Sequence, residues 1–207
     1  SLGCESFNGR DLKSHITKSG RPGELMIIQR DGGTRSTIEA GRAWVEQTLA
    51  ELGNTPRADI KPGELVIGTI CGGSDATSGL AANPAMGRAF DMLVDLGAAC
   101  IFEETGELIG CEGYMADRAV TPELGQAIID SVAKAHRHYH TLGHASISPG
   151  NAEGGLTTIE EKSMGAYAKS GAAPISGLLK PGDQPPKGGL YLLDMVSDGD
   201  VRFGFPS

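Results

Sequence analysis

The sequence predicts an α/β protein with a mostly parallel sheet and helices on both of its faces. Short apolar, β-branched runs alternate along the chain with longer segments whose apolar residues recur at helical intervals. Glycine supplies 31 of the 207 residues, about twice its usual share of roughly 7%, while 39% of the residues are hydrophobic. Many tight turns around an ordinary apolar core are typical of a rigid sheet. The length fits one domain over residues 1–207.

The first half of the chain predicts two pairs of a strand and a helix, followed by a third strand. An apolar run at 25–28 follows a Pro-Gly turn and predicts a strand, and apolar residues at 38–52 recur at helical intervals. A second run at 65–70 also follows a Pro-Gly turn and ends near two glycines. Asn83, which precedes a proline, is expected to cap the next helix, and the third strand is expected at 98–102.

The second half predicts three helices, two loops and one strand. In order, these are a short helix from Glu107, a longer helix at 122–142, a loop at 144–156, a helix from about 159, a loop at 171–189 and a strand at 190–193. The longer helix carries an apolar stripe and ends before a glycine, which is a typical stop signal. The pattern at 157–161 is that of a capping box and marks the start of the last helix.

Composition and motifs exclude several classes of function. A net charge of −8 argues against a nucleic-acid or anionic-membrane surface, although a local cation can still hold a small anionic substrate. The chain has neither the ~18-residue apolar run of a membrane span nor the layout of a signal peptide. Its four cysteines show no Cys-x-x-Cys spacing, which favours reduced thiols in a cytoplasmic protein. Nucleotide-binding glycine motifs are also missing.

The stretch at 70–84 is the first place in the chain where chemistry is expected. It follows the strand at 65–70 and holds a thiol, hydroxyls, one carboxylate and several glycines. In open α/β sheets, ligands collect beyond the carboxyl ends of the strands. Asp75 follows one strand and Glu104 follows the next, so both carboxylates are expected to face one crevice. For Asp75 alone there is a structural alternative, in which it bonds only the amides of its own turn.

Further acids and thiols suit a divalent cation or a general base. Glu107 and Glu112 follow Glu104 along the chain, and gathered carboxylates bind hard cations or accept protons. Glu107 has the alternative role of capping a helix. Cys71, and Cys4 in a similar place after a strand-like segment, are either ligands of a soft metal or small buried residues.

Glu161 and Lys162 lie at the start of the last predicted helix, after the glycine pair at 154–155. Helix amino ends attract carboxylates, so Lys162 is expected to hold a substrate anion or, if desolvated, to act as a base. In an equally open alternative, Glu161 serves the capping box and Lys162 is solvated. The histidines near the end of the longer helix favour a solvated helix end over a metal cluster, because only His136 and His140 among them share a helix face.

Several longer motifs together resemble the altronate/galactarate dehydratase family, which also includes the large subunit of sulfolactate sulfo-lyase. The motifs are Leu2-Gly3-Cys4-Glu5, Cys71-Gly72-Gly73-Ser74-Asp75 with Ser78-Gly79, Ala82-Asn83-Pro84-Ala85, Glu104-Thr105, and Gly154-Gly155-Leu156-Thr157-Thr158 with Glu161-Lys162-Ser163. The resemblance spans nearly the whole chain and covers the middle of the family's catalytic region. It therefore implies a fragment that lacks an amino-terminal β domain and a carboxyl-terminal segment.

The resemblance implies a Rossmann-like sheet and a metal-dependent lyase that removes water from a sugar acid such as altronate or galactarate. The chemistry would be abstraction of the proton next to a carboxylate, with iron(II) or manganese(II) stabilising the enolate. The implied residues are Asp75, Glu104, Glu161 and Lys162 for catalysis; Gly72, Gly73, Ser74, Asn83, Thr157 and Thr158 for substrate binding; and Cys4, Cys71, Glu107 and Glu112 for the metal.

Two alternatives to this function remain open at this point. The first is elimination of sulfite from sulfolactate, which needs the same enolate chemistry. The second is a structural or dimerising module without activity of its own. The expected partners are a small anionic hydroxy acid, a second copy of the chain, and an amino-terminal β domain or small subunit, with neither nucleic acid nor membrane.

Overall fold

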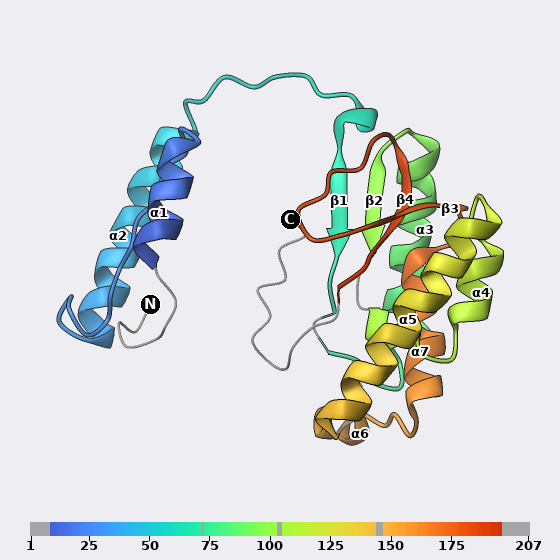
Figure 1. The fold of residues 1–207 in the computed structure, drawn as a ribbon. Coiled ribbons are helices and arrows are strands. Elements are labelled where there is room, and N and C mark those ends of the chain that lie inside the picture. Colours follow the sequence, from blue (N-terminus) through green and yellow to red (C-terminus); the bar gives the residue numbers. More distant parts are fainter. Residues whose placement is uncertain (1–8, 72, 103–104, 144–146, 196–207) are drawn as a thin grey trace. The chain divides into compact units, whose positions relative to one another are not determined.

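The structure, a computed structural model, describes residues 9–71, 73–102, 105–143 and 147–195 (Figure 1). Three of the predicted site residues, Cys4, Gly72 and Glu104, lie outside these residues. The sequence predicts one domain, whereas the contacts within the chain divide it into two compact units, Ser1–Asp59 and Ile60–Ser207. All strands that the structure describes belong to the second unit.

Over its described residues, 9–59, the first unit forms the helices α1 (Gly9–Lys18) and α2 (Thr34–Leu52). The helix expected at 38–52 is confirmed, but the strand expected at 25–28 is wrong, because this segment forms no ladder and leads into a turn. Its apolar side chains pack against helix glycines instead: a Cβ atom on Gly9 would lie 2.7 Å from Leu25, and one on Gly41 would lie 3.3 Å from Met26. Helix contacts thus partly cover the apolar side chains that the sequence pattern assigned to a sheet.

The second unit is built on a four-stranded parallel sheet, so the predicted α/β class is confirmed (Figure 1). Its strands are β1 (Val66–Thr69), β2 (Ala99–Phe102), β3 (Ile175–Leu179) and β4 (Gly189–Leu193), in the order β1-β2-β4-β3. β3 lies where the sequence predicted a loop. Its register shifts between Ile175 and Gly177, where the absent side chain leaves room for the ring of Tyr191.

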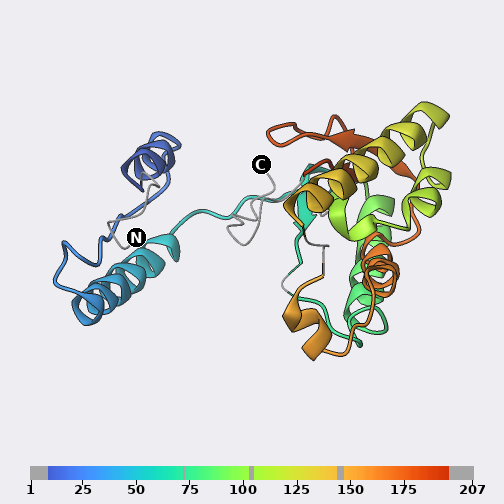
Figure 2. The same cartoon turned by 60° about the horizontal axis from the view of Figure 1, so that its bottom comes forward.

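In the second unit, a short helical turn precedes β1, and helices separate β1 from β2 and β2 from β3 (Figures 1 and 2). In chain order they are η1 (Pro62–Glu64), α3 (Ala82–Asp95), η2 (Thr105–Leu108), α4 (Glu112–Asp117), α5 (Pro122–Leu142), α6 (Pro149–Glu153), α7 (Ile159–Tyr167) and η3 (Ala168–Ser170). α5 ends at Gly143 in the left-handed conformation, as expected. α6 lies where only a loop was predicted, and its capping box at Ser148 explains why it forms.

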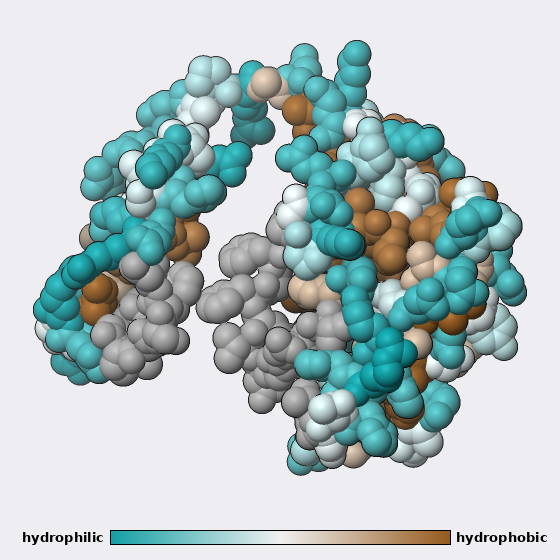
Figure 3. Space-filling model, viewed as in Figure 1, coloured by the Kyte–Doolittle hydropathy of each residue, from teal (hydrophilic) through white to brown (hydrophobic). Residues whose placement is uncertain are grey.

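The two faces of the sheet contribute to different apolar clusters. Phe102 and Leu192 on one face pack with Phe90 of α3 and Ile128 of α5. The cluster on the other face consists, among the described residues, of strand residues with Met195 packed against them. Figure 3 shows hydrophobic residues over β2 and β4 with hydrophilic residues around them. None of the described helices has the length and apolar composition needed to cross a membrane.

Candidate active site

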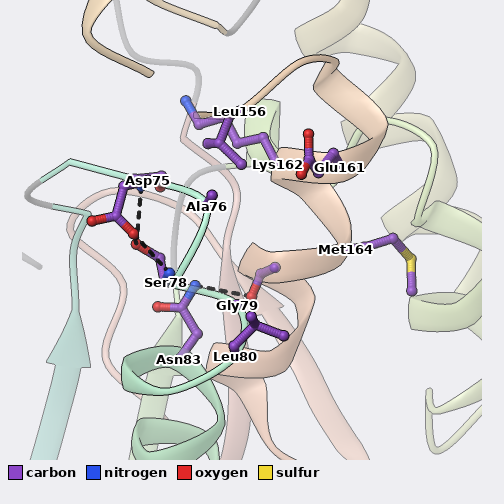
Figure 4. A pocket seen from close by; sticks show the side chains of 12 residues that line it. Asp75, Ala76, Ser78, Gly79, Leu80, Asn83, Leu156, Glu161, Lys162 and Met164 are labelled. Carbon is purple, nitrogen blue, oxygen red and sulfur yellow. Dashed lines mark hydrogen bonds between the residues drawn. The ribbon is translucent and has the colours of Figure 1, made fainter. Parts of the chain in front are cut away.

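A cavity of about 320 Å³ lies where the loop after β1, the start of α3 and the first turns of α7 meet (Figure 4). Its lining includes five of the predicted site residues: Ser74, Asp75, Asn83, Glu161 and Lys162. The structure therefore brings together two sequence motifs that lie more than 70 positions apart. Figure 4 shows Asp75 on the loop and Lys162 on α7 across the cavity from it.

Glycines allow the loop and α7 to approach this closely. A Cβ atom on Gly79 would lie 2.7 Å from the Cα atom of Gly165, so the two backbones meet with no room for a side chain. Asn83 donates a 2.9 Å hydrogen bond from its side chain to the carbonyl of Gly165. Asn83 was expected to cap α3, but the helix starts one residue before it, after Ala81. The buried amide of Asn83 instead ties α3 to α7.

Asp75 uses one carboxylate oxygen to organise its own turn. This oxygen accepts hydrogen bonds from the backbone and hydroxyl groups of both Thr77 and Ser78, at 2.8 to 3.2 Å. The hydroxyl and amide of Thr77, and then the hydroxyl of Ser78, lower the pKa of the Asp75 carboxyl. This is the structural role that the sequence left open. Asp75 is also one of the residues that line the cavity.

Glu161 is held in a similar way at the start of α7. Its carboxylate accepts 2.7 Å hydrogen bonds from the amide and the hydroxyl of Thr157, which lower the pKa of the Glu161 carboxyl. Thr158 caps the helix by accepting a hydrogen bond from the amide of Glu161. Thr157 and Thr158, both predicted to bind substrate, thus form local bonds that fix the first turn of the helix.

Lys162 forms part of a buried cluster of charges with Glu107 and Lys169. One carboxylate oxygen of Glu107 lies 3.1 Å from the Lys162 ammonium, and the other lies 3.1 Å from the Lys169 ammonium. All three side chains are nearly buried: Glu107 is 8% exposed, Lys162 is 9% exposed and Lys169 is 13% exposed. The sequence did not single out Lys169, because a lone lysine after a helix carries no motif.

Asn151 of α6 was also not singled out, and it connects three segments around the cavity. Its side-chain oxygen accepts hydrogen bonds from the amide of Ser148, at 2.8 Å, and from the Lys162 ammonium, at 3.2 Å. Its amide group donates to the carbonyl of Ser74 at 3.0 Å. The sequence signal that could have revealed Asn151 is Ser-Pro-x-Asn, a capping pattern with proline in the first turn.

The predicted metal ligands do not gather within the described residues. The Cys71 sulfur lies 3.4 Å from the Ser74 hydroxyl, and Glu112 accepts a hydrogen bond from the amide of Gly110. Both oxygens of Glu107 face lysines. In the part of the chain that the structure describes, no three side chains of His, Cys, Asp or Glu are placed to hold a metal ion. These residues alone therefore do not make a complete ligand set.

A second cavity, of about 440 Å³, lies at the carboxyl end of α5. His136 and His140 line it together with Tyr139 and Glu160. The two histidine side chains are exposed, which agrees with the solvated helix end preferred from the sequence. This cavity shares no lining residue with the one at Lys162.

Comparison with known proteins identifies relatives over most of the chain. Residues 63–202 match the family described as D-galactarate/Altronate dehydratase, C-terminal. The chain is 39% identical to galactarate dehydratase (L-threo-forming) of Escherichia coli (strain K12), over 95% of this chain and 40% of the relative. It is 36% identical to altronate dehydratase of Bacillus subtilis (strain 168), over 93% of this chain and 39% of the relative.

A third relative carries a different activity in its name. The chain is 37% identical to (2R)-sulfolactate sulfo-lyase subunit beta of Chromohalobacter salexigens, over 88% of this chain and 48% of the relative. The chain thus spans less than half the length of each of these three proteins.

Proposed function

The chain belongs to the D-galactarate/altronate dehydratase family, and from this premise we propose that it is part of a lyase that removes water from a sugar acid such as altronate or galactarate. The observation that carries the proposal is the cavity at Lys162. It brings a lysine, two acidic residues and an asparagine, namely Lys162, Asp75, Glu161 and Asn83, into the lining of one hollow. A hydroxy acid needs such a mixture of a cation, proton acceptors and hydrogen-bonding groups.

Lys162 is proposed to receive the carboxylate of the substrate. Its side chain is buried to all but 9%, so water weakens its attraction for an anion less than it would at an exposed surface. The proton next to that carboxylate is the one removed, and negative charge then develops on the carboxylate oxygens. An ammonium group already in place at those oxygens stabilises the charge as it forms.

Asp75 and Glu161 are proposed as proton acceptors. Hydrogen bonds hold the pKa of each carboxyl below its ordinary value, so both are ionised at neutral pH. An ionised carboxylate can take a proton, but it has none to give to the departing hydroxyl. The acid that protonates the leaving group is then expected elsewhere, and we propose Glu104, which the sequence predicted to be catalytic without assigning it a role.

A divalent cation, iron(II) or manganese(II), remains part of the proposal for the whole protein. Its contribution would be to stabilise the enolate. Because the described residues do not form a full ligand set, the steps above depend only on the protein's own groups. Metal analysis of the purified full-length protein tests this part separately.

Elimination of sulfite is the second candidate, favoured by the similarity to a sulfolactate sulfo-lyase subunit. The proton removed and the charge stabilised would be the same, and only the leaving group differs. The word subunit in the name of that relative also motivates the proposal that this protein works with a second polypeptide or a second copy of itself. Light scattering measures the mass of the full-length protein, alone and after co-expression with a candidate small subunit, and so tests for both kinds of partner.

The test is an assay of the full-length protein with altronate, galactarate and sulfolactate, following the keto acid and sulfite released. With the preferred acid, Lys162→Met is expected to lower kcat/KM by roughly 100-fold or more, as for loss of one charge-stabilising group. Lys134→Met is the matched control, because Lys134 pairs with Asp194 and does not line the cavity. Full activity of Lys162→Met, or a wild-type protein that turns over none of the acids, would overturn the proposal.

A further inference from the structure

We propose that Glu107 is a positioning residue that, together with Lys169, fixes the Lys162 ammonium at the edge of the cavity. The inference rests on the proposed function, in which Lys162 receives the substrate carboxylate. It assigns Glu107 a role different from the metal ligand expected from the sequence. It also adds Lys169, which does not line the cavity, to the residues on which the site depends.

The first support is the way in which Glu107 divides its two oxygens between two lysines. One oxygen faces Lys162 and the other faces Lys169, each at 3.1 Å. A lysine side chain has four carbons and many rotamers, so an ammonium group keeps one position only when partners hold it. For Lys162 these partners include the carboxylate of Glu107 and the side-chain oxygen of Asn151, at 3.2 Å.

The second support is that Glu107 itself stands on a rigid part of the second unit. It belongs to η2, whose residues Thr105 to Leu108 are all buried. The hydroxyl of Thr105 hydrogen-bonds to the carbonyl of Leu193 at the end of β4. A Cβ atom on Gly106 would lie 2.3 Å from the ring of Tyr139 on α5, so the turn is pressed against that helix. Through η2, Glu107 thus links the ammonium of Lys162 to the sheet and to α5.

The third support is the consequence of removing the charge. Without the Glu107 carboxylate, the ammonium groups of Lys162 and Lys169 would each lose an anionic partner at a buried site. Like charges at low exposure repel strongly, and each would move toward solvent or toward another partner. Lys162 would then leave the position in which it meets a substrate carboxylate.

The experiment compares Glu107→Gln with the wild type in the full-length protein. The variant keeps the shape of the side chain and removes its charge. Acylation of lysines at neutral pH, followed by peptide mass spectrometry, is expected to show Lys162 and Lys169 reacting several-fold faster in the variant, relative to Lys134 in the same sample. With the acid that the protein turns over, KM is expected to rise and kcat/KM to fall on the order of 100-fold, as for a misplaced binding group. Metal content is expected to stay unchanged.

The matched control is Glu160→Gln, an exposed carboxylate on the same helix as Lys162. It is expected to change neither the labelling of Lys162 nor KM. Should Glu107→Gln fail to fold, Lys169→Met replaces it: a smaller increase in Lys162 labelling and a roughly tenfold lower kcat/KM are expected, with recovery in Lys169→Arg.

Three results would overturn the inference. Unchanged labelling of Lys162 in Glu107→Gln and in Lys169→Met would show that the lysine is held without them. Faster labelling with an unchanged KM would reduce the cluster to a structural role. Loss of bound metal in Glu107→Gln would return Glu107 to the ligand set. If the wild type uses none of the acids, the proposed function fails, while the labelling still decides whether Glu107 positions Lys162.

Discussion

Asp75 lines the cavity and Glu107 pairs with Lys162, which also lines it, and the protein holds these two carboxylates in opposite ways. Asp75 is exposed and takes its bonds from residues two and three positions further along the chain. Glu107 is buried, and its partners Lys162 and Lys169 lie more than 50 positions away. The first carboxylate shapes a loop locally, whereas the second joins distant elements.

The difference teaches where the stability and the precision of the site come from. A local turn forms with little loss of chain entropy, and water replaces any hydrogen bond that it loses. A buried ion pair has no such replacement, because a partner left behind stays charged and poorly solvated. The site therefore combines an adaptable side, around Asp75, with a fixed side, around Glu107.

Replacing the buried carboxylate gives the largest expected effect. Glu107→Gln should lower the free energy of unfolding by about 3 to 5 kcal/mol, because two lysines at low exposure lose an anionic partner. Urea denaturation followed by circular dichroism measures this change. The exposed Glu160→Gln should stay within about 0.5 kcal/mol of the wild type. Equal losses of unfolding free energy in the two variants would show that the buried carboxylate stabilises the fold no more than the exposed one.

Moving the loop after β1 away from α7 is expected to give a smaller loss of stability. Gly79→Ala would push the loop away from α7, since the added Cβ atom meets the Cα atom of Gly165 at 2.7 Å. Overpacking of this kind costs about 1 to 3 kcal/mol, and the displaced loop should also raise KM. Gly113→Ala is the matched control: it lies in α4 with open space around it, so stability should be retained or slightly raised. Gly79→Ala with wild-type stability would mean that the close backbone contact is not needed.

Replacing the exposed carboxylate gives the smallest loss at neutral pH. Asp75→Asn keeps an oxygen that can accept the bonds of the turn, so the unfolding free energy at pH 7 should fall less than in the variants above. The pKa of Asp75 is lower in the folded protein than its ordinary value of 3.8. Its contribution to stability is therefore complete above pH 3.8 and is lost as the pH falls through the lower, folded value.

Unfolding experiments at pH 7 and at about pH 3 test this prediction. The gap in stability between wild type and Asp75→Asn should narrow in acid, because below pH 3.8 the Asp75 carboxyl of the unfolded chain takes up a proton more readily than that of the folded chain. A gap that stays constant with pH would show that the charge of Asp75 does not stabilise its turn.

The sequence predicted those parts of the fold that depend on neighbouring residues. β1, β2 and β4 are continuous apolar runs, and the ends of α5 carry proline at one side and glycine at the other. β3 was not predicted, because Ser176 and Gly177 split its apolar residues and it lies in a stretch rich in proline and glycine. The apolar run at 25–28 was assigned to a sheet because periodicity cannot tell a buried strand from a segment packed on helices.

The same contrast between local patterns and distant contacts holds for the candidate site. Asp75, Asn83 and Lys162 were predicted from motifs, and the structure places them around one cavity. Lys169 and Asn151 were not predicted, because their importance lies in partners that are distant in sequence. Pairing between distant charges leaves no periodic signal, so only the folded chain reveals it.

Asn151 has a practical consequence for anyone redesigning the specificity of this protein. Its side chain bonds Ser74 on one side and Lys162 on the other, so a change of shape in either segment is felt by both. Grafting only the loop after β1 from a relative with another substrate would leave behind Asn151 and Lys162, to which that loop is connected. A successful exchange would have to transplant that loop, α6 and the start of α7 as one cassette.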